Sequence, residues 1–187
     1  MESKNLSLFF VHLLGLRDPH AEGHSNHVAV LAVALAQKIG LPESQVQTLE
    51  FAAQVHDIGK IAINDFIVNK PGRYTEAEYG MIKQHSTIGA ELIKTLPLDP
   101  IIYLTVLNHH ENFDGTGYPN KIKGEQIPLE ARILRIADTY DALISNRVYH
   151  PARTHEEARR VIYQEEQKFD KDLLKVFFNL YHIQAPL

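Results

Sequence analysis

Apolar residues recur at three- and four-residue spacing along the whole chain, and strand-type alternation persists nowhere. This spacing predicts helices over residues 5–17, 24–39, 43–58, about 75–95, 100–108, 128–144, 154–167 and 172–182, with a short turn of helix after Asn64. No internal repeat or composition shift marks a linker. We therefore expect an all-α fold, a bundle of about seven helices.

Helix-end residues support these boundaries. Thr75 with Glu78, and Thr154 with Glu157, have the spacing of a capping box, in which the two side chains satisfy free amide groups at a helix start. Gly40 is suited to end the second helix, because glycine adopts the left-handed conformation without strain. Periodicity and capping thus indicate the same elements independently.

The longest irregular stretch runs from Phe113 to Ile127, directly after His109 and His110 at the end of a predicted helix. Asp114, Gly115 and Gly117 are residues typical of turns. Loops of about a dozen residues or more inside compact domains are often functional. The sequence therefore indicates a site where this helix meets its loop.

The length of 187 residues suits a single domain with a full core, and residues 1–19 are expected to form an N-terminal packing helix. Apolar residues make up 44% and charged residues 22% of the chain, and no segment approaches the ~18 uninterrupted apolar residues of a membrane span. The start of the chain does not show the order of residues found in a secretory signal. We expect a cytoplasmic protein without a membrane span.

Charge and residue usage narrow the chemistry further. A formal net charge of -4 argues against general nucleic-acid binding, which normally requires a basic surface. The absence of cysteine excludes disulfides, thiolate metal sites and a cysteine nucleophile. Eleven histidines are a heavy usage, and histidine is the commonest neutral metal ligand. Metal chemistry is the first hypothesis.

A set of histidines and acids lies at helix ends or on otherwise apolar helices. Its members are His24, His56, Asp57, His85, His109, His110 and Asp138. Each one alone is explained by a structural role, such as a histidine bonded to a carbonyl or an aspartate at a helix start. Together, five imidazoles and two carboxylates suit divalent iron, manganese, zinc or nickel.

The motifs in this set resemble a known family. His56-Asp57-Ile58-Gly59-Lys60 is similar to the motif of HD-domain metal-dependent phosphohydrolases, and His109-His110 through Gly117-Tyr118-Pro119 resembles the signature of the HD-GYP subfamily. Intervening segments match in the same order, so the resemblance covers residues 20–170. It implies an HD-domain helical bundle that acts as a cyclic di-GMP phosphodiesterase in bacterial signalling.

The resemblance also implies the metal ligands. His24, His56, Asp57 and Asp138 would hold one divalent ion, and Asp57, as a bridge, would hold a second with His85, His109 and His110. Iron or manganese is expected, with zinc or nickel as alternatives. A metal-bound hydroxide would attack the phosphate and open cyclic di-GMP to linear pGpG, with GMP as a further product.

Other site residues are also implied by the resemblance. Lys60 would neutralise the phosphate and act with Asp57 in catalysis, and substrate contacts are expected from Lys60, Gly117, Tyr118, Asp141 and Arg147. The loop 117–119 could also bind a signalling protein. Each of these residues also has a structural interpretation: Lys60 as an exposed lysine, Tyr118 as a loop anchor and Asp141 as a helix-surface acid.

The chain departs from the family pattern at four positions. His20 replaces a glutamate that binds a third metal in some members, so a third metal is not expected. His27 and His150 stand where basic residues are frequent, which removes fixed positive charge from the substrate site. Lys171 replaces a proline, a change expected to affect packing rather than chemistry.

Three other functions remain open at this stage. The domain could be a slow or inactive sensor of a cyclic dinucleotide that docks a partner protein, or an HD phosphohydrolase acting on another cyclic dinucleotide or nucleotide. A purely structural bundle would leave the seven candidate ligands unexplained.

Overall fold

The computed structural model describes residues 2–18, 20–145 and 152–180, and the described part is all-α. Its nine α-helices are α1 (Glu2–Gly15), α2 (Ala21–Lys38), α3 (Glu43–Val55), α4 (Asp65–Val68), α5 (Glu76–Lys94), α6 (Pro100–Asn108), α7 (Leu129–Ile144), α8 (His155–Gln164) and α9 (Lys171–Leu180). Short 3-10 helices η1 (Ile58–Ala62), η2 (Gly124–Gln126) and η3 (Glu166–Lys168) lie between them. The all-α prediction is confirmed; the helix number exceeds seven partly because α4 is only one turn long.

The predicted caps are present. Thr75 and Glu78 at the start of α5, and Thr154 and Glu157 at the start of α8, both form complete capping boxes. Gly40 follows α2 in the left-handed conformation, with φ of +82°. These interactions are local in sequence, which is why the pattern alone could predict them.

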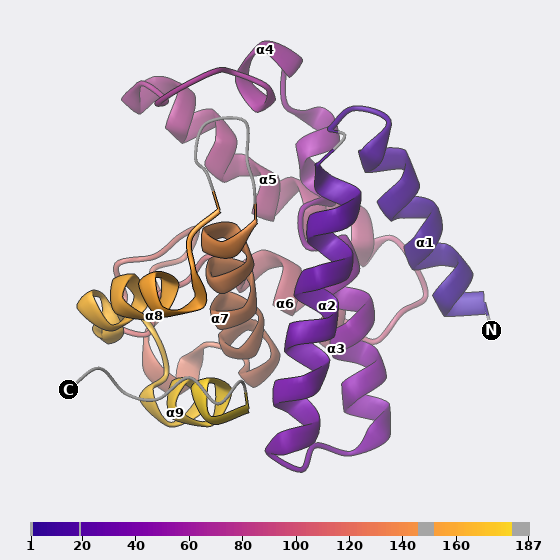
Figure 1. The fold of residues 1–187 in the computed structure, drawn as a ribbon. Helices are drawn as coiled ribbons and strands as arrows, with labels where there is room; N and C mark the ends of the chain where they lie inside the picture. Colours follow the sequence, from indigo (N-terminus) through magenta and orange to yellow (C-terminus); the bar gives the residue numbers. More distant parts are fainter. Residues whose placement is uncertain (1, 19, 146–151, 181–187) are drawn as a thin grey trace.

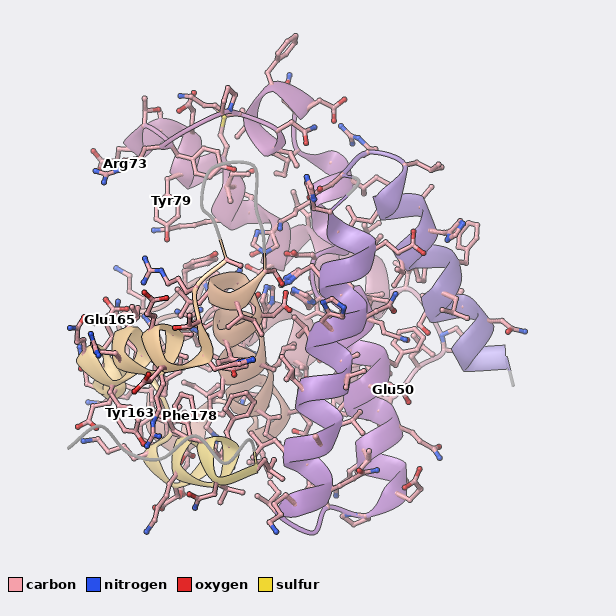
Figure 2. All side chains as sticks on the ribbon, viewed as in Figure 1. Glu50, Arg73, Tyr79, Tyr163, Glu165 and Phe178 are labelled. Carbon is pink, nitrogen blue, oxygen red and sulfur yellow. The ribbon has the colours of Figure 1, made fainter. Side chains whose placement is uncertain are left out.

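The helices enclose two hydrophobic cores on either side of α3. One core joins α2, α3, α7, α8 and α9 and includes Leu35, Tyr140 and Phe177. The other joins α1, α3, α5, α6 and the first residue of α2, and includes Phe51 and Val106. Figure 1 shows α1, α2 and α3 on one side of the molecule and α7, α8 and α9 on the other, with α6 between them. Where α8 meets α9, Tyr163 and Phe178 stack with ring centroids 5.4 Å apart (Figure 2).

The end of α3 differs from the prediction. The helix was expected to continue to residue 58 but ends at Val55, and the chain turns through His56 and Asp57 into η1. Gly59 lies in η1 so close to α5 that a Cβ atom there would be 1.9 Å from the carbonyl oxygen of His85. The turn and the glycine together bring Asp57 against α5.

No described helix is long and apolar enough to cross a bilayer.

Candidate metal centre

All seven predicted ligands converge at one place between the two cores. His24 comes from α2, His56 and Asp57 from the turn after α3, His85 from α5, His109 and His110 from the end of α6, and Asp138 from α7. Five of the seven are buried, and His24 and His110 are partly exposed. Residues separated by up to 114 positions therefore lie in one cluster.

Asp57 lies at the centre of this cluster. One of its carboxylate oxygens is 3.4 Å from Nε2 of His56 and 4.0 Å from Nε2 of His24, and the other is 3.3 Å from Nε2 of His85. Its side chain belongs to two groups of converging ligand atoms, one with His24 and His56 and the other with His85, His109 and His110. A carboxylate placed in this way can bridge two cations.

Backbone carbonyls orient three of the histidines. Nδ1 of His56, His85 and His109 lies 2.6–2.7 Å from the carbonyl oxygen three residues earlier, on Ala53, Ile82 and Val106. A carbonyl oxygen can only accept, so each Nδ1 donates its hydrogen. In the neutral imidazole Nε2 then carries the lone pair and faces the cluster, which is the orientation of a metal ligand.

This orientation leaves nitrogen atoms that need a positive partner. Nε2 of His85 and Nε2 of His109 face each other at 3.2 Å. Nε2 of His56 is buried and has no hydrogen-bond partner among the described residues. Opposed lone pairs repel unless a cation or proton lies between them, and an unsatisfied buried nitrogen costs free energy. The donor set therefore fits bound divalent metal.

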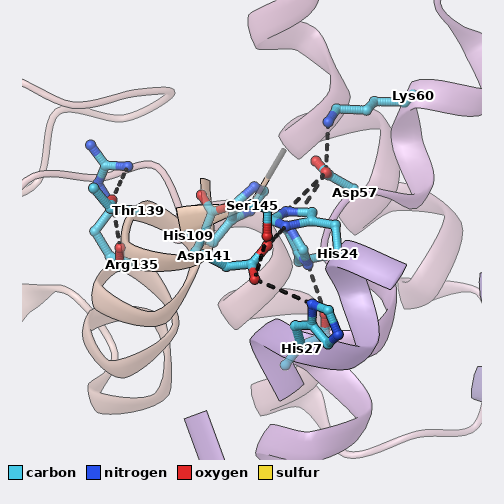
Figure 3. A network of polar contacts seen from close by, with 12 residues as sticks. His24, His27, Asp57, Lys60, His109, Arg135, Thr139, Asp141 and Ser145 are labelled. Atoms are coloured by element: carbon cyan, nitrogen blue, oxygen red, sulfur yellow. Dashed lines mark hydrogen bonds and ion pairs between the residues drawn. The ribbon is translucent and has the colours of Figure 1, made fainter. Parts of the chain in front are cut away.

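His24 is held between two aspartates of α7. Its Nδ1 donates to the carboxylate of Asp141 at 2.6 Å, and its Nε2 lies 3.2 Å from the carboxylate of Asp138. Figure 3 shows Asp57 and Asp141 on different sides of the His24 ring. Asp141 is buried and also accepts a hydrogen bond from Ser145, so it lies behind His24 as an orienting group.

Burial and charge keep the ligands in metal-binding protonation states. Burial lowers the pKa of His85, and burial with neighbouring imidazoles lowers the pKa of His109 and His110 well below the usual range. Burial acts to raise the pKa of Asp57, but the Lys60 ammonium, together with His56 and His85, outweighs this effect and holds the pKa well below its usual range. Neutral imidazoles and an ionised carboxylate are the forms that bind metal.

His24 behaves differently from the other histidines in the metal-free cluster. Burial lowers its pKa, but the hydrogen bonds to Asp138 and Asp141 outweigh burial and raise the pKa to about 9. The positive charge of a protonated His24 then occupies the place between carboxylates that a cation would take.

The 117–119 loop packs directly on a ligand. The ring centroid of Tyr118 is 4.8 Å from that of His110, and the Tyr118 amide donates to the His110 carbonyl. A Cβ atom at Gly117 would lie 2.3 Å from the Asn112 amide nitrogen, so the close approach requires glycine. Glu111 is buried and accepts hydrogen bonds from the Asn120 and Lys121 amides, which fixes the far side of the loop.

The remaining predicted residues are placed as follows. Lys60 donates to Asp57 at 2.6 Å and lines the cleft. His20 is exposed at the start of α2, outside the two ligand groups. Arg147 and His150 lie outside the described residues.

A cleft of about 1660 Å³ opens onto the cluster. The lining residues that were not predicted from the sequence include Tyr79 and Lys83 on α5 and Arg135 on α7. Arg135 donates to Asn112 and Thr139 (Figure 3 shows the Thr139 contact). Their positions on helix surfaces carry no signal in the sequence, because only the packing of α5 and α7 on α6 turns these faces toward one cleft.

Comparisons with known proteins agree with this geometry. A family model described as "HD domain" matches residues 9–173. The chain is 45% identical over 148 residues to the cyclic di-GMP phosphodiesterase response regulator RpfG of Xanthomonas campestris, covering 78% of this chain and 38% of that protein. It is 33% identical over 177 residues to the 3'3'-cGAMP-specific phosphodiesterase 2 of Vibrio cholerae, covering 93% and 34%. The chain thus spans less than half of the length of these relatives.

A solved structure shares the fold. Bd1817, described as a HDG"Y"P protein from Bdellovibrio bacteriovorus, aligns with a TM-score of 0.70 at 22% identity, over 85% of this chain and 51% of that one. The chain belongs to the HD-domain family, and its His109–Pro119 signature places it in the HD-GYP group. The family and the buried histidine–aspartate cluster together indicate divalent metal binding.

Proposed function

We propose that this chain is a metal-dependent phosphodiesterase that opens cyclic di-GMP to linear pGpG, with GMP as a further product. The observation that carries the proposal is the position of Asp57, whose two oxygens face two separate groups of ligands. A site for two adjacent cations is the arrangement used for in-line displacement at phosphorus. The relative named a cyclic di-GMP phosphodiesterase supports the choice of substrate.

The chain's own residues would hold and orient the reacting groups. Asp57 bridges the two halves of the site, and Asp141 fixes the His24 ring through Nδ1. Lys60, at the cleft side of Asp57, is placed to contact a phosphate oxygen and balance its charge. Two divalent cations bound here would stabilise charge on the phosphoryl oxygens and lower the pKa of water in the site.

Substrate contacts are proposed for Lys60, Gly117, Tyr118, Asp141 and Arg147. Lys60, Gly117, Tyr118 and Asp141 line the cleft, which supports the proposal for these four. The contacts of Asp141 with His24 favour an orienting role over direct reading of a base. The loop 117–119 is also proposed as the place where a signalling protein would bind.

Iron or manganese is the proposed metal pair, because the set combines imidazoles with a bridging carboxylate and contains no thiolate. Zinc and nickel remain alternatives within the same chemistry. Elemental analysis of anaerobically purified protein would identify the ions. We expect about two equivalents in the native chain.

The activity is tested by incubating protein loaded with manganese or iron with cyclic di-GMP and separating the products by chromatography. Linear pGpG should accumulate with the native chain and not with Asp57→Asn or His56→Ala. Circular dichroism on each variant would show whether the fold is retained. Equal product from native and variant proteins would contradict the proposal.

A second candidate substrate is 3'3'-cGAMP, which the similarity to a Vibrio cholerae enzyme specific for it supports. Equimolar competition between the two cyclic dinucleotides would decide which is cleaved first. Tight binding of either one without turnover would favour a sensor over an enzyme.

A further inference from the structure

Lys83 on α5 is a partly buried cation whose charge is not neutralised by the described part of the protein. Its Nζ lies 4.3 Å from the ring centroid of Tyr79 and 5.3 Å from that of Tyr118. None of the ion pairs among the described residues includes it. Two aromatic rings can hold an ammonium group in place while leaving its charge available to an anion.

The other described cations of the cleft already have hydrogen-bond partners in the protein. Four lysine or arginine side chains line it: Lys60, Lys83, Arg135 and Lys168. Lys60 pairs with Asp57, and Lys168 pairs with Glu165, each at 2.6 Å. Arg135 donates to Asn112 and Thr139. Lys83 is therefore the best-placed described cation for a second anionic group of a ligand, in addition to the phosphate proposed for Lys60.

Lys83 lies one aromatic ring away from the metal cluster. Tyr118 contacts the ligand His110 at 4.8 Å between ring centroids and is also the second ring near Lys83. Tyr79 projects from α5 on the side of the molecule where α8 lies (Figure 2). A cyclic dinucleotide has two phosphates separated by a ribose, so when one phosphate is at the cluster the other lies a short distance along the cleft.

We propose that Lys83 binds the second, uncleaved phosphate of the cyclic dinucleotide, and that Tyr79 and Tyr118 hold the ammonium group there. This inference rests on the proposed function and adds a second anion site to it. Lys83 would thus select substrates with two phosphates over simple phosphodiesters. An ammonium–phosphate contact is a charge-assisted hydrogen bond, the stronger kind in proteins.

The test compares steady-state kinetics of native protein, Lys83→Gln and Lys94→Gln, all loaded with manganese. Lys94 is a matched control, because it is also on α5 and also lies over a tyrosine, Tyr103, at 5.7 Å, but outside the cleft. For Lys83→Gln we expect the KM for cyclic di-GMP to rise about tenfold with little change in kcat, as for the loss of one charged hydrogen bond. Lys94→Gln should match the native protein.

A second substrate separates phosphate binding from a general effect on the metal site. Bis(p-nitrophenyl) phosphate has one phosphate, so its kcat/KM should fall much less in Lys83→Gln than kcat/KM for cyclic di-GMP. Equal losses on both substrates, or an unchanged KM for cyclic di-GMP, would overturn the inference. Failure of the native protein to cleave cyclic di-GMP would instead reject the proposed function. Tyr79→Leu should reproduce part of the Lys83→Gln effect, and Tyr79→Phe should not.

Discussion

At the scale of single residues, the second interaction of each histidine decides how it can bind metal. A carbonyl three residues earlier orients His56, His85 and His109, and the carboxylate of Asp141 orients His24. These partners fix which ring nitrogen faces the cluster. The candidate ligands and the groups behind them therefore form one functional unit.

Asp141 provides a test at this scale. Asp141→Asn keeps the shape of the side chain but removes the charge that His24 Nδ1 contacts. We expect manganese affinity to fall about 10- to 100-fold, as for the loss of other groups that orient metal-bound histidines. Competition with a chelating dye would measure it. Unchanged metal affinity with weakened cyclic di-GMP binding would show that Asp141 contacts substrate instead.

At the scale of elements, the approach of η1 to α5 positions the bridging carboxylate. Gly59 lies against the backbone of α5 at His85, and Gly89 of α5 lies beside Gly59. Because η1 and α5 each have a glycine at this contact, Asp57 comes within 3.3 Å of His85. The glycine of the His56–Lys60 motif thus has a packing role inside η1.

Gly59→Ala should be strongly destabilising. The added Cβ would meet the His85 carbonyl oxygen at 1.9 Å and the Gly89 amide nitrogen at 2.6 Å, both backbone atoms. We expect a loss of roughly 3 kcal/mol in the free energy of unfolding, measured by urea denaturation. Gly80→Ala is the control, because Gly80 is exposed on α5 with nothing within 4 Å of a Cβ, and should stabilise by about 0.5–1 kcal/mol. A similar, small effect for both variants would contradict the packing role.

At the scale of the whole molecule, the cluster joins the two hydrophobic cores. Its ligands come from α2, the turn after α3, α5, α6 and α7; α7 belongs to one core, α5 and α6 belong to the other, and α2 and α3 contribute to both. A metal ion that binds the folded but not the unfolded chain would stabilise the whole fold rather than one helix.

Metal loading should therefore raise the melting temperature. With free manganese at about 100 times its dissociation constant, linkage gives about 2.7 kcal/mol of added stability. For a domain of this size that corresponds to an increase of about 5–10 °C in Tm. Calorimetry with and without metal would measure it, and His56→Ala should show a smaller increase. Equal Tm values for native apo and loaded protein would count against metal binding at this cluster.

The helices and the metal-ligand candidates could be predicted from the sequence because both are recognised from residues that lie close together in the chain. Periodicity shows which face of a helix is buried, and Thr75 with Glu78 shows where one begins. Four of the ligand candidates could be identified by their position at predicted helix ends: His56, Asp57, His109 and His110.

The contacts between helices were decided only by the tertiary structure. The sharing of Asp57 between two ligand groups, the position of Asp141 behind His24, and the position of Lys83 beside Tyr118 each join residues far apart in the chain. A hydrophobic pattern specifies that a face is buried but not which helix covers it. For that reason the sequence by itself determined the elements and the ligand types, and packing alone decided how they form one site.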